Sequence, residues 1–224
     1  MIKIFLDSSD INAIREYKDK VHGFTTNPTL MRKAGVSDYE KFCKEVLAEV
    51  GNKPVSFEVF ADDFDEMERQ AKLISSWGDN VYVKIPITNT KGEYSVELIK
   101  KLSDLKLNIT AVTELSQVKN LKSAINSKSI ISIFAGRIAD TGREPEEYVL
   151  KSKSLVGGLA QILWASPREV LNIYQAEEAG ADIITCTPEL ITKYEKFKDM
   201  DLDELSLETV KMFYNDGKEA GYKL

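Results

Sequence analysis

Residues 81–88 read VYVKIPIT, a short run that has the composition of a buried β-strand and carries a lysine at its centre. Further apolar runs of this kind recur along the whole chain. The segments between them place apolar side chains at helical spacing, as in 64–77 and 114–126. The sequence therefore predicts eight strand-then-helix units, whose strands lie in residues 2–7, 23–27, 54–60, 81–86, 105–112, 129–136, 159–166 and 181–188.

Strands that alternate with helices form a parallel sheet, and strands that are mostly apolar form a sheet covered on both faces. Eight such units close into an α/β fold of the (β/α)₈ TIM-barrel type. The competing fold, an open doubly wound sheet, binds dinucleotides through a glycine-rich turn after its first strand. Residues 6–14, LDSSDINAI, contain no glycine and favour the barrel. We predict one domain over residues 1–224, with an additional C-terminal helix at about 203–221.

Composition limits the classes of partner. The chain has 43% hydrophobic and 29% charged residues, and no apolar run approaches the roughly 18 residues that span a membrane. Its first residues, MIKIFLDSSD, reach an acidic side chain too early for a signal peptide, which favours a cytoplasmic protein. A formal net charge of −6 argues against binding to nucleic acid, because phosphate contacts need a positive field. We therefore predict a small-molecule partner, with no nucleic acid and no membrane.

Cysteine and histidine are too few for several kinds of site. Cys43 and Cys186 lack metal-ligand spacing and are predicted to be core thiols. His22 is the one histidine of the chain, so a two-histidine metal site is impossible, and we read it as a loop residue. We predict no metal site, and acid–base chemistry must use carboxylates, lysine or tyrosine.

Functional groups of such barrels lie at the carboxyl ends of the strands and in the loops that follow. Nearly every predicted strand of this chain ends in a polar group. The candidate site residues are the aromatic Phe134 and the polar residues Asp7, Thr26, Asn27, Glu58, Lys84, Asn108, Thr110, Ser132, Arg137, Ser166 and Arg168.

Several candidates also have a structural explanation. Asp7 could cap the first helix, and Asn27 with Pro28 could form a turn. Residues 166–169, SPRE, fit a capping box with proline at the first helical position. A helix start that carries Arg168 is at the same time a possible anion site.

Lys84 is harder to explain structurally. Burial in a strand disfavours the ammonium and favours the neutral amine, which is a nucleophile. A lysine near a strand end could instead extend its amine to solvent, and taken alone the two readings are equal. Glu58 lies in an otherwise apolar strand just before, and a carboxylate there needs a partner. Together, the two residues favour Schiff-base chemistry on a carbonyl substrate.

The strand-end motifs LDSSD, GFTTNPTL, VYVKIP, LNITAV, SIFAGRI and ASPRE, in this order, resemble the transaldolase family. The resemblance runs from residue 2 to about 190, and the short length is similar to the compact branch, which includes the fructose 6-phosphate aldolases. It implies a transferase that needs no cofactor and acts in carbohydrate metabolism, in the pentose phosphate pathway. The substrates implied are a ketose phosphate donor, of the fructose 6-phosphate or sedoheptulose 7-phosphate type, and an aldose phosphate acceptor.

The resemblance also implies roles for the candidates. Lys84 would attack the C2 carbonyl of the ketose, and Glu58 would move protons through a water held by Thr110. Asp7 would take the proton of the C4 hydroxyl as the C3–C4 bond breaks. A dihydroxyacetone unit would stay on Lys84 until the acceptor arrives. The implied substrate-binding residues are Asn27, Asn108 and Ser132 for this unit, Arg137, Ser166 and Arg168 for phosphate, and Thr26 and Phe134.

Three functions follow as alternatives. Glu58, Asn108 and Phe134 resemble transaldolases, whereas the aldolase branch has glutamine and tyrosine at the first and last of these positions. An aldolase that releases free dihydroxyacetone is the second alternative, and a non-catalytic barrel that binds sugar phosphates is the third. Ile133, Pro167 and the segment 138–148 depart from the family pattern near the phosphate end, which leaves the donor and acceptor sugars open. The additional C-terminal helix offers a surface for a homo-oligomer.

Overall fold

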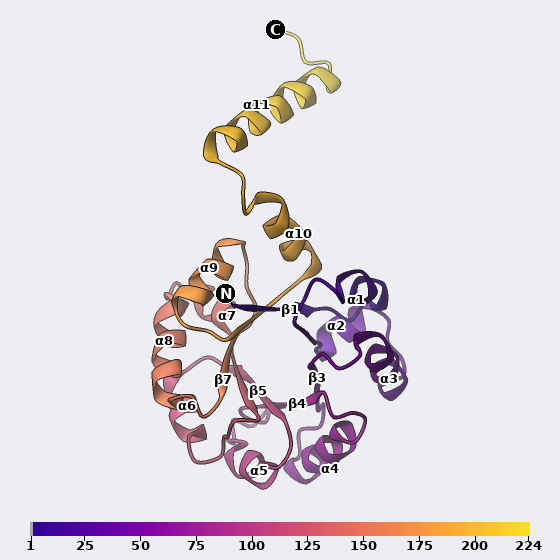
Figure 1. Cartoon of the computed structure of the whole chain (residues 1–224). Helices are drawn as coiled ribbons and strands as arrows, with labels where there is room; N and C mark the ends of the chain where they lie inside the picture. Colours follow the sequence, from indigo (N-terminus) through magenta and orange to yellow (C-terminus); the bar gives the residue numbers. More distant parts are fainter. Residues whose placement is uncertain (1) are drawn as a thin grey trace.

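The computed structural model describes residues 2–224, and its strands close into a parallel barrel in chain order (Figure 1). The predicted TIM barrel is confirmed. Neighbouring strands pair in parallel throughout, and Glu58 lies opposite Lys84, which lies opposite Asn108. The strands are β1 (Lys3–Asp7), β2 (Gly23–Thr25), β3 (Val55–Glu58), β4 (Val81–Pro86), β5 (Leu107–Val112), β6 (Ser129–Ile133), β7 (Gln161–Trp164) and β8 (Ile183–Cys186).

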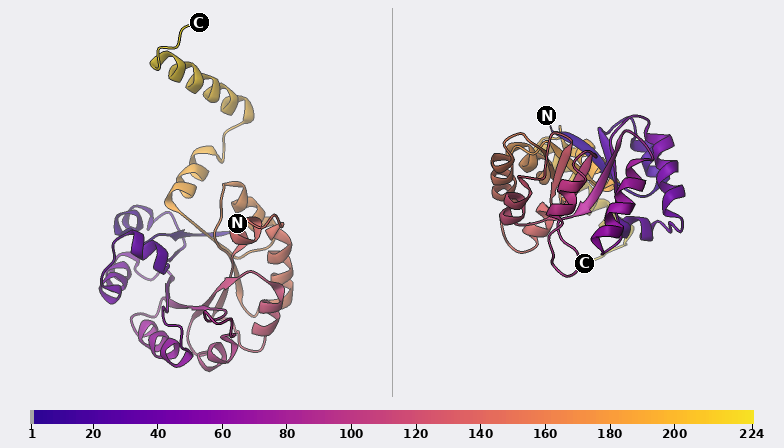
Figure 2. Two further views of the ribbon diagram at one scale, coloured as in Figure 1. Left: turned by 180° about the vertical axis from the view of Figure 1, so that it is seen from behind. Right: turned by 90° about the horizontal axis from the view of Figure 1, so that it is seen from below.

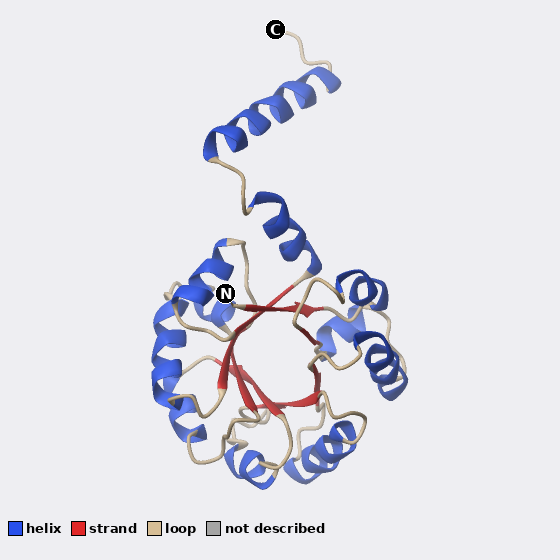
Figure 3. Cartoon of the chain, viewed as in Figure 1, coloured by secondary structure: helices blue, strands red, loops and turns tan. Residues whose placement is uncertain are grey.

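A ring of helices surrounds the strands (Figure 3). Two helices follow β2 and two follow β6, so both connections are longer than a single strand-then-helix unit requires. The helices are α1 (Ile11–Tyr17), α2 (Pro28–Lys33), α3 (Tyr39–Val50), α4 (Phe64–Ser75), α5 (Val96–Lys101), α6 (Leu115–Leu121), α7 (Ala135–Ala139), α8 (Pro145–Val156), α9 (Leu171–Glu178), α10 (Pro188–Phe197) and α11 (Leu202–Glu219).

The core has two parts. Side chains such as Leu6, Phe57 and Trp164 are fully buried in the main core cluster, which also includes helix side chains such as Ile14. A smaller cluster, formed by Phe5, Ile130, Leu163, Ala165 and Ile183, fills the inside of the barrel. Side chains that are two residues apart on a strand face the same side, so Asp7 also points into the barrel, above Phe5. The apolar cluster thus forms a floor under the polar carboxyl ends.

Strand β4 has the predicted bounds, β1 and β5 end where predicted, and the remaining strands end earlier than predicted. Strand β2 ends at Thr25, β6 at Ile133 and β7 at Trp164. As a result, Asn27, Phe134 and Ser166 lie in the loops after these strands. Asn27 and Phe134 stand directly before α2 and α7, so the strands end there because the chain enters a helix.

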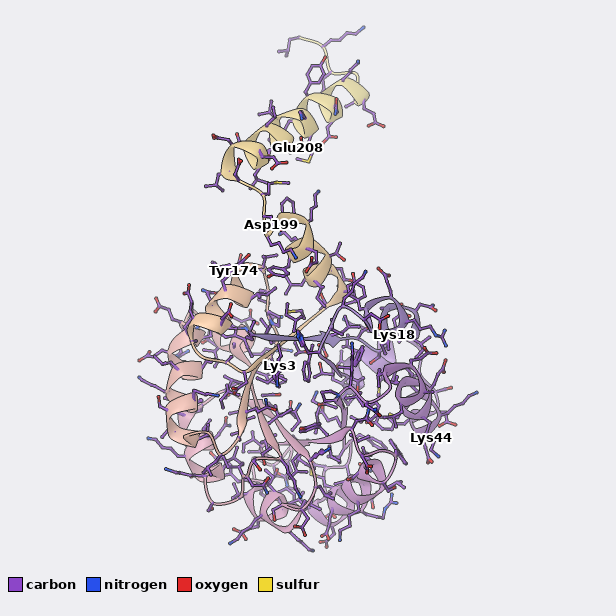
Figure 4. The ribbon with its side chains drawn as sticks, in the orientation of Figure 1. Lys3, Lys18, Lys44, Tyr174, Asp199 and Glu208 are labelled. Atoms are coloured by element: carbon purple, nitrogen blue, oxygen red, sulfur yellow. The ribbon has the colours of Figure 1, made fainter. Side chains whose placement is uncertain are left out.

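The chain leaves the barrel after α10, and α11 projects away from it (Figure 2). The predicted C-terminal helix is present, and none of its residues is buried. Its side chains around Glu208 extend into solvent, far from the strands (Figure 4). Among the helices of residues 2–224, none combines the length and the hydropathy needed to cross a bilayer.

An assembly that depends on α11 is our first prediction. The helix exposes a set of large apolar side chains, an arrangement that is costly in water and typical of a contact surface. We expect the whole chain to form a homo-oligomer and a chain that ends at Met200 to be a folded monomer. The exposed side chains are Leu202, Leu205, Leu207, Val210, Met212, Phe213 and Tyr214.

Light scattering measures the molar mass of the whole chain and of the chain that ends at Met200. Circular dichroism tests whether the shortened chain folds. Loss of α11 removes no buried side chain from the barrel, so its melting temperature should change little apart from any loss of assembly. A whole chain that is monomeric at micromolar concentration would contradict the prediction.

Candidate active site

A cavity of about 550 Å³ opens at the carboxyl end of the barrel. Of the predicted site residues, all except Thr26 and Asn108 line it. The lining residues are Asp7, Thr25, Asn27, Pro28, Thr29, Leu30, Lys33, Glu58, Lys84, Thr110, Ala111, Ser132, Phe134, Arg137, Ala165, Ser166, Arg168 and Thr185. The strand ends therefore bring the sequence candidates to one place.

Lys84 lies in the centre of this group and is 6% exposed. Its Nζ is 2.9 Å from Oε2 of Glu58 and donates a hydrogen bond of 2.9 Å to the carbonyl oxygen of Thr26. The amine does not extend to solvent, so the reading of Lys84 as a solvent-directed side chain is wrong. The register of β3 and β4 places the two charged groups side by side, and each compensates the burial of the other.

Thr110 lies near this pair, on a distorted part of β5. The pairing with β6 shifts register between Ile109 and Val112, and Ala111 has a left-handed φ of 61°. Such a bulge redirects side chains at the end of a strand. The Thr110 hydroxyl is buried and has no hydrogen-bond partner within residues 2–224. Its hydrogen-bonding capacity is thus available to a molecule in the cavity.

Asp7 is held by a chain of two threonine hydroxyls. Thr25 Oγ1 donates a hydrogen bond of 2.8 Å to Asp7 Oδ1, and Thr185 Oγ1 is 2.5 Å from Thr25 Oγ1. Since the single proton of Thr25 points to Asp7, the hydroxyl of Thr185 donates to Thr25. Burial raises the pKa of Asp7, although Lys84 and Thr25 oppose this rise. Asp7 is not the cap of α1, because Asp10 occupies that position.

Asn108 lies beneath the cavity and is fully buried. Its side-chain nitrogen donates to Oγ of Ser56 at 3.1 Å, and its side-chain oxygen accepts from Oγ of Ser132 at 2.7 Å. Ser132 in turn lines the cavity. In this structure Asn108 therefore orients Ser132.

Asn27 and Thr26 also have structural roles. Asn27 caps α2, because its side-chain oxygen accepts from the backbone N–H of Leu30 at 2.9 Å, and it lines the cavity as well. Asn27 therefore has a structural role as a helix cap and is at the same time available to a molecule in the cavity. Thr26 directs its hydroxyl to the carbonyl oxygen of Ser56 and faces the site through its own carbonyl.

The mouth of the cavity carries Arg137, Arg168 and Lys33. The loop after β7 differs from the prediction, because α9 begins at Leu171 and not at Pro167. Ser166 has a left-handed φ of 63° and does not cap a helix. The SPRE capping box is therefore wrong.

The side chain of Asn172 takes the place of this cap. Its Oδ1 accepts hydrogen bonds from the backbone N–H groups of Arg168, at 2.7 Å, and Glu169, at 3.2 Å. These N–H groups are thereby occupied, and the charge available to an anion comes from the side chains of Arg137, Arg168 and Lys33.

Sequence reasoning missed Thr25, Thr185 and Lys33. Thr185 gives a signal like that of Lys84, because it lies between apolar residues of a short strand, whereas Thr25 stands beside Thr26 and gives a weaker one. Lys33 gives no such signal. It lies at the end of α2 and reaches the cavity only through the way α2 packs over the end of the barrel.

Solved structures share the architecture of this chain. The 3-hexulose-6-phosphate synthase from Salmonella typhimurium aligns with a TM-score of 0.60 and 16% identity, over 83% of this chain and 89% of the synthase. The orotidine 5'-monophosphate decarboxylase from Metallosphaera sedula aligns with a TM-score of 0.58 and 13% identity, over 94% and 97%. At such low identity the similarity concerns the fold alone.

Sequence comparison is more specific. The family model for Transaldolase/Fructose-6-phosphate aldolase matches residues 4–224. A probable transaldolase from Dehalococcoides mccartyi is 35% identical over 82% of this chain and 86% of its own length. Another, from Chelativorans sp., is 32% identical over the whole of both chains. The chain therefore belongs to the transaldolase/fructose-6-phosphate aldolase family.

Proposed function

We propose that this protein is a transaldolase that moves a dihydroxyacetone unit from a ketose phosphate to an aldose phosphate. The observation that carries the proposal is the buried pair of Lys84 and Glu58, whose charged atoms are 2.9 Å apart inside the cavity. An amine beside a carboxylate can pass its proton on and become a nucleophile. Family membership supports the same chemistry.

The first half of the reaction forms the Schiff base. Lys84 transfers a proton to Glu58 and its Nζ attacks C2 of the ketose. The carbonyl oxygen takes a second proton from the attacking nitrogen and becomes a hydroxyl. Glu58 then returns a proton to this hydroxyl, which leaves as water, and a C2=N bond to Lys84 remains. The free hydroxyl of Thr110 is suited to hold the water that carries these protons.

The second half breaks and remakes a carbon–carbon bond. Asp7 takes the proton of the C4 hydroxyl, C4 becomes an aldehyde, and the electron pair of the C3–C4 bond moves into the Schiff base. The aldose phosphate leaves and a three-carbon enamine stays on Lys84. A second aldose phosphate is attacked by C3 of this enamine, and hydrolysis frees the new ketose. Ser132 and Asn27 line the cavity and are suited to hold the hydroxyls of the three-carbon unit.

The phosphate group belongs at the mouth of the cavity in this proposal. Arg137 and Arg168 lie there with Ser166, and guanidinium groups bind phosphate by paired hydrogen bonds. Sugar phosphates are confined to the cell interior by their charge, and we propose a cytoplasmic enzyme of carbohydrate metabolism. Because the net charge is −6, we do not propose nucleic acid as a partner.

Borohydride reduction tests the proposal directly. With fructose 6-phosphate as donor, reduction should attach a three-carbon adduct to Lys84, which peptide mass spectrometry locates. A folded protein without an adduct at Lys84 would overturn the Schiff-base mechanism. It would leave the non-catalytic barrel as the alternative, and robust turnover with any pair of sugars excludes that barrel.

Release of free dihydroxyacetone is the second candidate function. The side chain at position 134 decides our preference, because Phe134 lines the cavity and cannot donate a proton to release the enamine. With donor alone we expect one equivalent of aldose phosphate and then arrest, followed by sustained turnover once an acceptor is added. Fast and sustained release of triose without acceptor would favour the aldolase.

The hydroxyl of Thr25 gives a prediction about pH. Asp7 must be ionised to act as base, so the rate of carbon–carbon cleavage should rise as pH increases through its pKa. The hydrogen bond from Thr25 lowers this pKa. Thr25→Val removes the bond, so the acidic limb of the kcat profile should move to higher pH.

The matched control is Thr25→Ser, which keeps the hydroxyl and should keep the profile of the natural enzyme. The measurement is kcat against pH for the three proteins. Identical acidic limbs in the valine variant and the natural enzyme would show that Asp7 does not control this limb.

A further inference from the structure

The guanidinium of Arg168 is held by a carboxylate that lies outside the cavity lining. Its Nη2 is 2.5 Å from Oδ2 of Asp140 and its Nε is 3.3 Å from Oδ1. Asp140 follows α7 directly, one turn after Arg137. The contact thus joins the loop after β6 to the loop after β7.

These two loops pack closely where the contact forms. A side-chain carbon at Gly136 would lie 1.7 Å from the carbonyl oxygen of Ser166 and 3.2 Å from Nε of Arg168. The position therefore admits only glycine. The backbone N–H of Asp140 donates to the carbonyl oxygen of Gly136 at 3.0 Å, which fixes Asp140 on the same turn.

Arg168 needs such a partner, because its own surroundings do not restrain its side chain. It lies in the loop before α9, and its side chain is 47% exposed. A free arginine at the surface samples many rotamers, and phosphate binding would have to order it. Asp140 uses the Nε edge of the guanidinium, and the remaining N–H groups are left for a second anion.

We propose that Asp140 is a positioning residue that fixes Arg168 for the phosphate group of the sugar substrates. The inference rests on the proposed function. Two opposing effects decide the sign of the contribution of Asp140, because its carboxylate repels a phosphate dianion while it orders Arg168. Exposed charges repel weakly through water, and a bidentate arginine gains much of its affinity from correct orientation. Ordering therefore outweighs repulsion.

The test compares phosphorylated and unphosphorylated acceptors. In Asp140→Ala, KM for glyceraldehyde 3-phosphate should rise about tenfold, which corresponds to about 1.4 kcal/mol, and KM for glyceraldehyde should not change. The inhibition constant of inorganic phosphate should rise by a similar factor. Asp140→Asn keeps one acceptor for Arg168 and should lie between the natural enzyme and the alanine variant.

Glu169→Gln is the matched control for net charge. Glu169 is exposed on the same loop and forms no ion pair within residues 2–224, so its removal changes the charge of the rim without releasing Arg168. This variant should show an unchanged or slightly lower KM for glyceraldehyde 3-phosphate. A general loss of fold in the Asp140 variants would raise both values of KM or lower kcat alone, and is thereby separated from loss of position.

Two results would overturn the inference. An Asp140→Ala variant with unchanged KM for the phosphorylated acceptor would show that Arg168 needs no support. A lower KM would show that Asp140 competes with the phosphate. Borohydride trapping at Lys84 is measured in every variant, so absence of an adduct in the natural enzyme counts against the proposed function, whereas a normal adduct with unchanged KM counts against Asp140 alone.

Discussion

Replacement of Lys84 by methionine is expected to abolish both turnover and borohydride trapping. Methionine keeps the length of the side chain but has no nucleophile. Within residues 2–224, the other lysine that lines the cavity is Lys33, which lies at the end of α2 and not on a strand. We expect kcat to fall on the order of 10⁴-fold or more, as when other covalent nucleophiles are removed. Donor depletion and adduct mass are the measurements.

Lys84→Met also tests how much the ion pair of Lys84 and Glu58 contributes to stability. The side chain of Glu58 is 18% exposed, and without Lys84 its carboxylate loses its cation. Breaking such a pair from one side costs about 3–5 kcal/mol, unless the carboxyl takes up a proton. The double variant Lys84→Met, Glu58→Gln removes both charges and should recover much of the lost melting temperature while it stays inactive.

Lys106→Met is the control for lysine removal, because Lys106 lies at the opposite end of the barrel and does not line the cavity. It should keep full activity and a normal adduct. Residual trapping in the folded Lys84 variant, at a rate near that of the natural enzyme, would place the nucleophile elsewhere.

The barrel and the centre of the site could be predicted from sequence because both depend on local pattern. A strand that is buried on both faces tolerates a charged residue only with a partner, so Lys84 in VYVKIP and Glu58 in VSFEVF were visible as exceptions. The alternation of side chains then fixes which residues share the interior of the barrel. Equal attention to that pattern would also have identified Thr185, which lies between Ile184 and Cys186, whereas Thr25 beside Thr26 is not marked by it.

The mouth of the cavity could not be predicted in this way. SPRE is a good local cap, yet α9 starts later because Gly136 brings the loop after β6 against Ser166. Contacts between the loops after β6 and β7 thus override the preference of SPRE to start a helix. The pairing of Arg168 with Asp140 is invisible for the same reason, since it joins exposed residues that are 28 positions apart. The direction of α11 is likewise not encoded in its own amphipathic pattern.

Replacement of Asp7 by asparagine should separate the two halves of the reaction. Asparagine keeps the shape of the side chain and can accept the hydrogen bond from Thr25, but it cannot take the proton of the C4 hydroxyl. Lys84 and Glu58 are unchanged, so the Schiff base should still form. Carbon–carbon cleavage should slow by about 10²–10⁴-fold, the usual contribution of a general base.

The mass of the trapped adduct distinguishes this outcome from a general loss of activity. Borohydride and fructose 6-phosphate should leave an intact six-carbon phosphate on Lys84 in Asp7→Asn, and a three-carbon unit in the natural enzyme. Asp10→Asn is the matched control. Asp10 caps α1 and does not line the cavity, and asparagine caps a helix equally well. A three-carbon adduct formed by Asp7→Asn at the natural rate would assign the base to another residue.

Stability gives an independent check on the same residue. Burial raises the pKa of Asp7, so its ionised form is disfavoured in the folded protein compared with the unfolded chain. At a pH above this raised pKa, the carboxylate therefore lowers the free energy of unfolding, and a neutral asparagine relieves that cost. We expect Asp7→Asn to melt at the same temperature as the natural enzyme or higher at neutral pH, and to lose this advantage as the pH falls and Asp7 takes up its proton. A variant that is inactive and yet no less stable would mark Asp7 as a residue kept for chemistry at the expense of the fold.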